Sequence, residues 1–314
     1  MNRTVQIILS VFAGVLAYVF FVLMFFPLDA VIGHFLAKME EDTKGEWRVS
    51  VANIDSSLLF DTEFLDFHVF KLGKEVFYAS KLSVGASPFA FLGDNIDVSF
   101  SAEYQKGEIS GRAQFTQNKS QFAVNVLDIE FDDMAFAEMR FIPTSFDLQG
   151  TTVAFDGKLN GTVYMQLARD IRSSLVEIDL QLKEVGTKSI FLSDMNLTIP
   201  ALTLSNAKEE VVINGVLERG KVVLNKLNVP GPDIRLDLEG SAKLNQNLSF
   251  LGMNFNGKLS LSNAFLQSVP FLADLPELDE QKLPDGSYPI SVRRSFSDPQ
   301  LLVGTLDVSK QLNL

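Results

Sequence analysis

The hydrophobic pattern of this chain has two regimes: a continuous apolar run at the start and a period-two alternation over most of the rest. No charged residue stands between Arg3 and Asp29. A helix needs about 20 apolar residues to cross a bilayer, so residues 4–28 are long enough to do so. In lipid the backbone must satisfy its own hydrogen bonds, which a helix does. The run therefore predicts a transmembrane helix that ends near Pro27.

A cleaved signal peptide is the alternative interpretation of the same run. Its apolar core usually has about 7–15 residues and is followed by small residues at a cleavage site. Here the run is longer and leaves through Phe25, Phe26 and Pro27, which favours an uncleaved, single-pass anchor. Because Arg3 precedes the run, the positive-inside rule predicts a cytoplasmic N-terminus, with the bulk of the chain in the periplasm of a Gram-negative cell.

The rest of the chain divides where the apolar period changes. Residues 29–44 carry apolar side chains at helical spacing, whereas Trp47, Val49 and Val51 alternate with Arg48 and Ser50, a strand pattern. We therefore expect an inner-membrane protein with three parts. These are a cytoplasmic tip and anchor at 1–28, a juxtamembrane helix at 29–46 and a periplasmic β domain at 47–314.

Strict alternation in later segments predicts a mainly β fold, a long antiparallel meander with one wet face. Charged residues such as Glu103, Asp179 and Asp237 fall on the wet face. The positions predicted to form the apolar face are Val98, Phe100, Ala102, Ile178, Leu180, Leu236 and Leu238. Alternation alone does not decide whether this face is an open groove or a sealed core.

Two kinds of local signal interrupt the strands. An acidic or amide residue followed by glycine recurs within strand-like sequence, at Gly157, Gly215, Gly240 and Gly257. Such a glycine either makes a tight turn or bends a long strand. Ser262 precedes a short apolar segment and is expected to cap a helix. Residues 131–146 are irregular and predict a short helix over one end of the sheet.

The composition removes several classes of function. The net charge of −12 and the absence of cysteine argue against a nucleic-acid partner, thiol chemistry and thiolate metal sites. The chain has two histidines and lacks the common nucleotide-binding, hydrolase and metalloprotease motifs. Paired acids such as Asp132 and Asp133 are more typical of a solvated surface than of a glycosidase. We therefore expect no catalytic residues, no cofactor and no metal.

Several stretches resemble the type II secretion system protein N family, which is related to the AsmA-like envelope proteins. They are SPFAFLGDNIDVSFSAEYQKGEISGRAQF (87–115), the Asp156-Gly157 and Asn256-Gly257 steps, LNVPGPDIRLDLEGSAKL (227–244) and DGSYPISVRRSFSDPQ (285–300). The family often has a glycine where Arg293, Arg294 and Ser295 stand here. Together these stretches extend over most of the chain.

The resemblance implies a function as well as a shape. It implies a non-catalytic accessory component of the general secretory machine that exports folded proteins from the periplasm, in contact with other secretion components. In AsmA-like relatives the sheet curves into a U-shaped groove with an apolar interior. The alternative function implied by that groove is the binding or transfer of phospholipid or another acyl lipid in the cell envelope.

Overall fold

The computed structural model describes most of the chain after residue 27. The described ranges are 28–56, 61–86, 95–118, 121–139, 145–148, 151–168, 170–192, 197–244, 251–269, 279–295 and 298–309. The predicted anchor lies outside these ranges. None of the helices within them has both the length and the apolar character needed to cross a bilayer.

Strands dominate the described chain, as the alternation predicts. The helices are α2 (Leu28–Asp42), α3 (Asn263–Ser268) and the single 3-10 turns η2 (Phe136–Glu138) and η3 (Ile171–Ser173). The strands of the first half are β1 (Trp47–Ser50), β2 (Asn53–Ser56), β3 (Asp61–Lys71), β4 (Lys74–Ala86), β5 (Asn95–Glu103), β6 (Glu108–Asn118), β7 (Gln121–Ala135), β8 (Ser145–Leu148) and β9 (Thr151–Gln166). Those of the second half are β10 (Leu175–Thr187), β11 (Ile190–Leu192), β12 (Leu197–Ile199), β13 (Val211–Glu218), β14 (Lys221–Pro230), β15 (Ile234–Leu244), β16 (Leu251–Leu261), β17 (Tyr288–Ser295), β18 (Asp298–Val303) and β19 (Leu306–Asp307).

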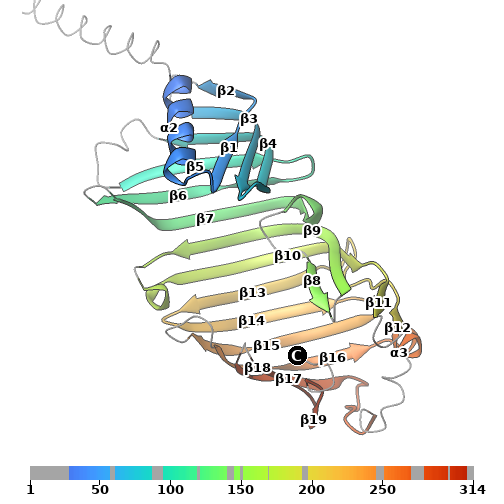
Figure 1. Cartoon of the computed structure of the whole chain (residues 1–314). Coiled ribbons are helices and arrows are strands. Elements are labelled where there is room, and N and C mark those ends of the chain that lie inside the picture. The colour runs from blue at the N-terminus through green and yellow to red at the C-terminus, as the bar shows by residue number, and fades with distance from the viewer. Residues whose placement is uncertain are drawn as a thin grey trace, which may run out of the picture.

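The strands form one large, open antiparallel sheet in meander order (Figure 1). Each strand from β3 to β7 pairs with the next, β9 lies between β7 and β10, and the meander then runs from β13 to β19. Strand β8 pairs with the first residues of β9, and β11 and β12 form a separate hairpin. The predicted antiparallel β meander is confirmed.

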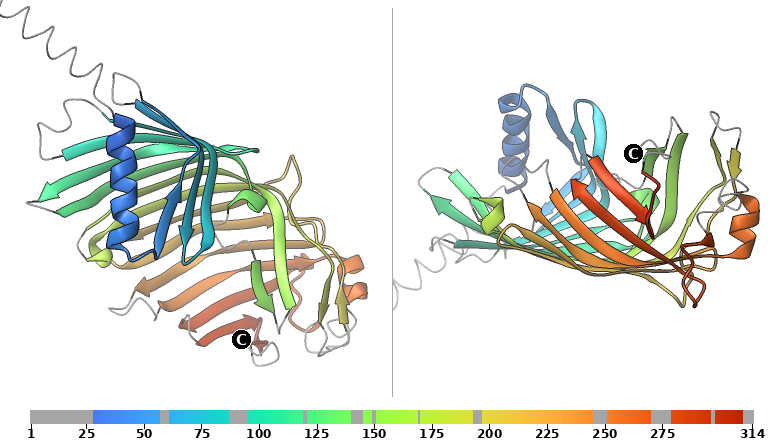
Figure 2. Two further views of the ribbon diagram at one scale, coloured as in Figure 1. Left: turned by 45° about the horizontal axis from the view of Figure 1, so that its top comes forward. Right: turned by 90° about the horizontal axis from the view of Figure 1, so that it is seen from below.

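The long strands of the sheet are not paired with each neighbour over their whole length. Strand β4 pairs with β3 over most of its length but with β5 only from Lys81 onward. In the same way β9 pairs with β8 at Thr151–Ala154 and with β7 from Lys158 onward. Figure 2 shows β1–β4 and the first half of β9 rising on the same side of the sheet, which is therefore concave on that side.

The glycines singled out in the sequence all lie inside strands. Gly157 and Gly240 have φ values of 153° and 148°, a conformation that side chains rarely permit. Gly215 sits at a register shift between β13 and β14. At Gly257 a Cβ would overlap the carbonyl oxygen of Asp237 on β15. Of the two roles open to these glycines, a place within long, bent strands is the one that the structure shows.

Two of the three predicted local helices are present; the one predicted over 131–146 is wrong at its start, which is strand. Helix α2 occupies most of the range 29–46 and packs against β1 and β2. Helix α3 begins after Ser262, whose Oγ accepts a hydrogen bond of 3.0 Å from the backbone N–H of Phe265, a standard N-terminal cap. The irregular stretch after residue 131 contributes the single turn η2, and strand β7 continues as far as Ala135.

We expect Gly257→Ala to lower the free energy of unfolding by about 1–3 kcal/mol, because the added methyl group meets the backbone of β15. Gly252→Ala, on the same strand, is the matched control, since a Cβ there meets no atom within 4 Å. Chemical denaturation of the two variants measures the difference. Equal stability would show that β15 and β16 do not approach each other in this way.

Candidate apolar binding face

Residues directly opposite each other on antiparallel strands point to the same face of the sheet, so a row of partners can be followed across the molecule. One such row, here called the first row, runs through β2–β7, β9, β10 and β13–β19. It consists of Ile54, Phe64, Leu82, Ala102, Ile109, Phe131, Gly161, Leu180, Ile213, Leu227, Leu238, Gly257, Ile290, Val303 and Leu306. Every member is apolar or glycine.

A second row lies beside the first on the same face and runs from β4 to β18. It consists of Val84, Phe100, Gly111, Ile129, Val163, Ile178, Gly215, Leu224, Gly240, Phe255, Val292 and Leu301. Two of its glycines make room for the neighbouring ring. A Cβ on Gly111 would lie 2.8 Å from Cζ of Phe100, and one on Gly240 would lie 2.9 Å from Cδ1 of Phe255. Aromatic rings thus cover glycine backbone on this face.

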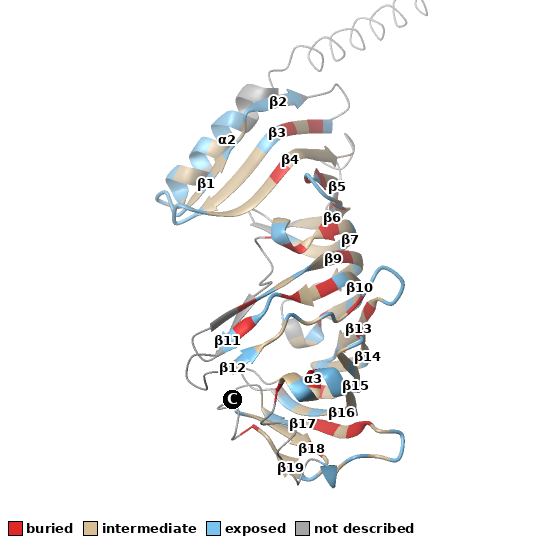
Figure 3. Cartoon of the chain, turned by 90° about the vertical axis from the view of Figure 1, so that its right-hand side faces the viewer, coloured by how far each residue is buried: buried red, intermediate tan, exposed pale blue. Residues whose placement is uncertain are grey.

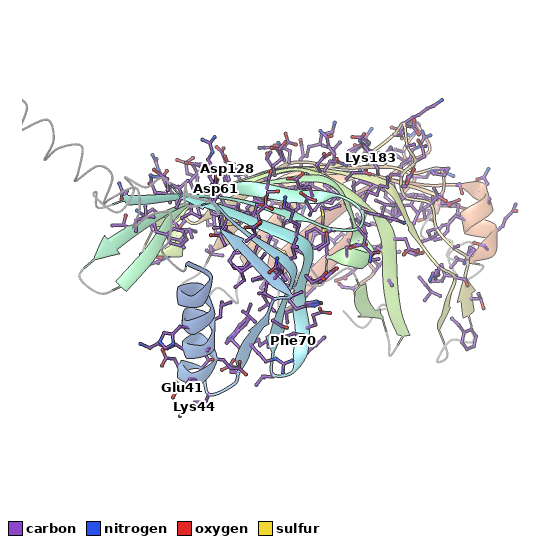
Figure 4. The ribbon with its side chains drawn as sticks, turned by 90° about the horizontal axis from the view of Figure 1, so that it is seen from above. Glu41, Lys44, Asp61, Phe70, Asp128 and Lys183 are labelled. Atoms are coloured by element: carbon purple, nitrogen blue, oxygen red, sulfur yellow. The ribbon has the colours of Figure 1, made fainter. Side chains whose placement is uncertain are left out.

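The opposite face is polar. The row of partners that alternates with the first two consists of Glu63, Ser83, Ser101, Ser110, Glu130, Thr162, Asp179, Asn214 and Lys226. Figure 4 shows Asp128 and Lys183 on the side of the sheet away from α2. Helix α2 lies on the concave side (Figure 2). The convex face is therefore the polar one and the concave face the apolar one.

All seven residues predicted for the apolar face lie on it. Ala102, Leu180 and Leu238 belong to the first row, and Phe100 and Ile178 to the second. Val98 opposes Ala86 and Ala113, and Leu236 opposes Val229 and Leu259, in flanking rows that are also apolar. Sequence reasoning missed other members of the rows, such as Phe131, Val163 and Phe255. Their alternation is visible in the sequence, but only the register shows that they continue one row.

Burial differs between the two rows of the apolar face: several first-row side chains are buried, whereas second-row side chains are of intermediate exposure. The larger cluster gathers Ala79, Ala102, Tyr104, Ile109, Phe131, Met134, Phe136, Met139, Leu159, Val185 and Val211. A smaller one gathers Tyr288, Ile290 and Val303 near the C-terminal edge. Beside these clusters, second-row side chains such as Ile178, Leu224 and Phe255 are only partly buried. Figure 3 accordingly shows separate buried patches in a sheet that is mostly of intermediate exposure.

Aromatic rings line the apolar face at the end near α2. The ring of Phe67 packs edge-on against Phe64 at 5.6 Å and against Phe77 at 6.1 Å between centroids, and Phe77 packs in the same way against Tyr104 at 6.0 Å. Such edge-on pairs stabilise the wall beyond the area they bury. This series of edge-on ring contacts ends at Tyr104, whose hydroxyl is a polar group.

That polar group is unusual. Tyr104 is only 7% exposed, and its buried hydroxyl has no hydrogen-bond partner among the described residues. Burial, with the nearby charge of Glu138 as a smaller cause, raises the pKa of the Tyr104 phenol. A buried polar group without a partner costs about 1–3 kcal/mol.

Other polar groupings are less suited to a binding role. A pocket of about 410 Å³ beside η3 is lined by Asp170, Arg172, Ser173 and Arg219. Its Arg172 already donates to Asp170 at 2.6 Å, and this hydrogen bonding lowers the pKa of the Asp170 carboxyl. Within the described ranges no group of three or more His, Asp or Glu side chains is placed to hold a metal ion. The apolar face is therefore the candidate site.

Comparison with known proteins adds no further support. No protein-family description, no curated protein and no solved structure matches the chain. The secretion and lipid functions implied by the sequence resemblance stay predictions, and the argument for a function rests on the geometry of the sheet.

Leu180→Asp tests the assignment of the two faces. Leu180 packs against the larger cluster, so a carboxylate there should destabilise the fold by about 2–5 kcal/mol. Asp179→Asn is the control. Asp179 is the next residue to Leu180 and is exposed on the polar face, so its replacement should leave the free energy of unfolding nearly unchanged. Urea denaturation of both variants gives the comparison. Similar losses at the two positions would mean that the register of β10 is wrong.

Proposed function

We propose that this chain is a non-catalytic protein of the cell envelope whose concave apolar face binds the acyl chains of lipids. The observation that carries the proposal is the pair of adjacent apolar rows, which cross nearly all strands of an open sheet and of which the second row is only partly buried. A contiguous apolar face is a recognised mark of a ligand-binding or interaction site.

The dimensions suit acyl chains. Neighbouring strands lie about 4.8 Å apart, so the first row is about 65 Å long when it is measured along the sheet. One acyl chain spans about half of a 30 Å hydrocarbon core, or about 15 Å. Several chains therefore fit along the face, and each buried CH2 group contributes about 0.8 kcal/mol to binding. The predicted membrane anchor at residues 4–28 would keep this face close to a supply of lipid.

A second function, interaction within a secretion complex, is favoured by the charges of the convex face. Strands β5–β7 carry Asp97, Glu103, Glu108, Asp128, Glu130, Asp132 and Asp133 against the single base Arg112. On this face strands β14–β17 carry Lys221, Lys226, Arg235, Lys243, Lys258 and Arg293 against the two acids Asp237 and Glu239. Segregated charge of this kind favours oriented docking of a charged protein partner. The two functions use opposite faces of the sheet and are compatible.

Photo-crosslinking in living cells separates the two functions. A benzophenone amino acid replaces Phe255 in the second row of the full chain. The matched control replaces Asn254, which is exposed and opposes Ser241 and Arg293 in a row of the polar face. After irradiation of Gram-negative cells, mass spectrometry should find lipid adducts at position 255 and none at position 254.

The alternatives give different products. Lipid adducts at both positions would indicate general contact with membrane and contradict a dedicated face. A folded variant that gives no lipid adduct at position 255 would overturn lipid binding. A protein adduct at position 254 would support the interaction role on the convex face, whatever happens at position 255.

A further inference from the structure

We infer that Tyr104 is the polar contact for the ester group of the bound lipid, so that the carbonyl end of an acyl chain lies at the β4–β5 end of the concave face. This inference rests on the proposed lipid binding and makes it more specific. It names the chemical class of the ligand, an esterified acyl chain, and the direction in which that chain lies.

The position of Tyr104 is the first step of the argument. It follows β5 immediately and stands two residues after Ala102, so its side chain lies on the same apolar face. Its ring packs there against Phe77. Ala102 belongs to the first row. A chain whose carbonyl meets the Tyr104 hydroxyl would run along that row toward β10. Because Ala102, Ile109 and Phe131 are buried there, the cluster must repack to admit it.

The unpartnered hydroxyl is the second step. A buried tyrosine normally finds a hydrogen-bond partner for its O–H, yet the Tyr104 hydroxyl has none among the described residues. The group is buried in a cluster made otherwise of apolar side chains. An acceptor brought by a ligand would supply the missing partner.

The electrostatics select the kind of acceptor. Burial and the charge of Glu138 both raise the pKa of the phenol, so the group stays protonated and acts as a donor at neutral pH. The same negative charge disfavours an ionised carboxylate close to Tyr104. A neutral ester carbonyl can accept a hydrogen bond from the phenol and is not repelled by Glu138. An ionised fatty acid can accept the same hydrogen bond but is repelled by Glu138.

The surrounding cluster can adapt to a ligand. Met134 and Met139 belong to the same cluster as Tyr104 and are almost fully buried. Methionine is unbranched and has three rotatable bonds, so it can repack around an inserted chain. The single turn η2 precedes Met139 directly and has no side-chain hydrogen bond at its N-terminal cap, Ala135.

A matched pair of lipids tests the inference on the full chain held in nanodiscs. The probes are 1-palmitoyl-lysophosphatidylcholine and its 1-O-hexadecyl ether analogue, which share headgroup and chain length and differ in the ester carbonyl. Competition against a photoreactive acyl lipid measures their affinities. The natural protein should bind the ester about fivefold to tenfold more tightly than the ether, the gain expected of one buried hydrogen bond.

Tyr104→Phe removes only the hydroxyl. The variant should bind both probes with the affinity of the ether, and its melting temperature should not fall, because no protein hydrogen bond is lost. Tyr78→Phe is the control. The Tyr78 hydroxyl is exposed and already donates to Asp66 at 3.5 Å, so the ester preference should survive.

Each other outcome has a distinct meaning. If neither probe binds to the natural protein, the proposed lipid binding itself fails. If both bind equally well, or if Tyr104→Phe keeps the ester preference, the inference fails while lipid binding stands. A clear drop in the melting temperature of Tyr104→Phe would show that the hydroxyl has a structural partner, and this too would overturn the inference.

Discussion

The register of the antiparallel strands is the constraint on which the rest of this molecule depends. Side chains alternate between faces with a period of two, so a slip of one residue would move a strand's apolar set to the convex face. The first row keeps its apolar or glycine identity through β2–β7, β9, β10 and β13–β19. It does so even though register shifts occur nearby, between Gln114 and Phe115 and between Leu224 and Leu227. The first shift lies beyond both rows and the second lies between them, so both rows stay intact.

A single open sheet must also manage its two edges, since unpaired strand edges promote aggregation. At the N-terminal edge, β1 and β2 both pair with β3, and α2 packs against them. At the C-terminal edge, β18 begins with Asp298 and Pro299 and its end is covered by β19. A charge and a proline are both unfavourable to an added strand. The edges are thus protected, and the proposed ligand would lie on the concave face of the sheet.

Much of the fold followed from the sequence, because its signals are local. Alternation at Ile178 and Leu180 identifies one face of β10, and Ser262 identifies the start of α3 through a cap that needs only neighbouring residues. The role of Gly240 could not be decided in advance, since a glycine after an acid serves a tight turn and a bent strand equally well. The choice depends on where β16 lies, which is a tertiary question.

The candidate site was predictable only in part for the same reason. Single alternating segments placed Phe100 and Leu238 on an apolar face, but their membership of separate rows depends on the bulges of other strands. The isolation of the Tyr104 hydroxyl depends on Glu138 and η2, which are brought close by the path of β7. The charge segregation of the convex face also needs the strand order, because only pairing shows that β5–β7 form one surface.

The openness of the concave face is the central claim, and cysteine accessibility measures it most directly. The natural chain has no cysteine, so single replacements by cysteine can be labelled without background. Ile178→Cys should react with a maleimide more slowly than Asp179→Cys on the exposed polar face but much faster than Ala79→Cys, whose site is 0% exposed. Added acyl lipid should slow the reaction at position 178 alone. If position 178 is instead as protected as position 79 in the absence of lipid, the face is sealed and the account is wrong.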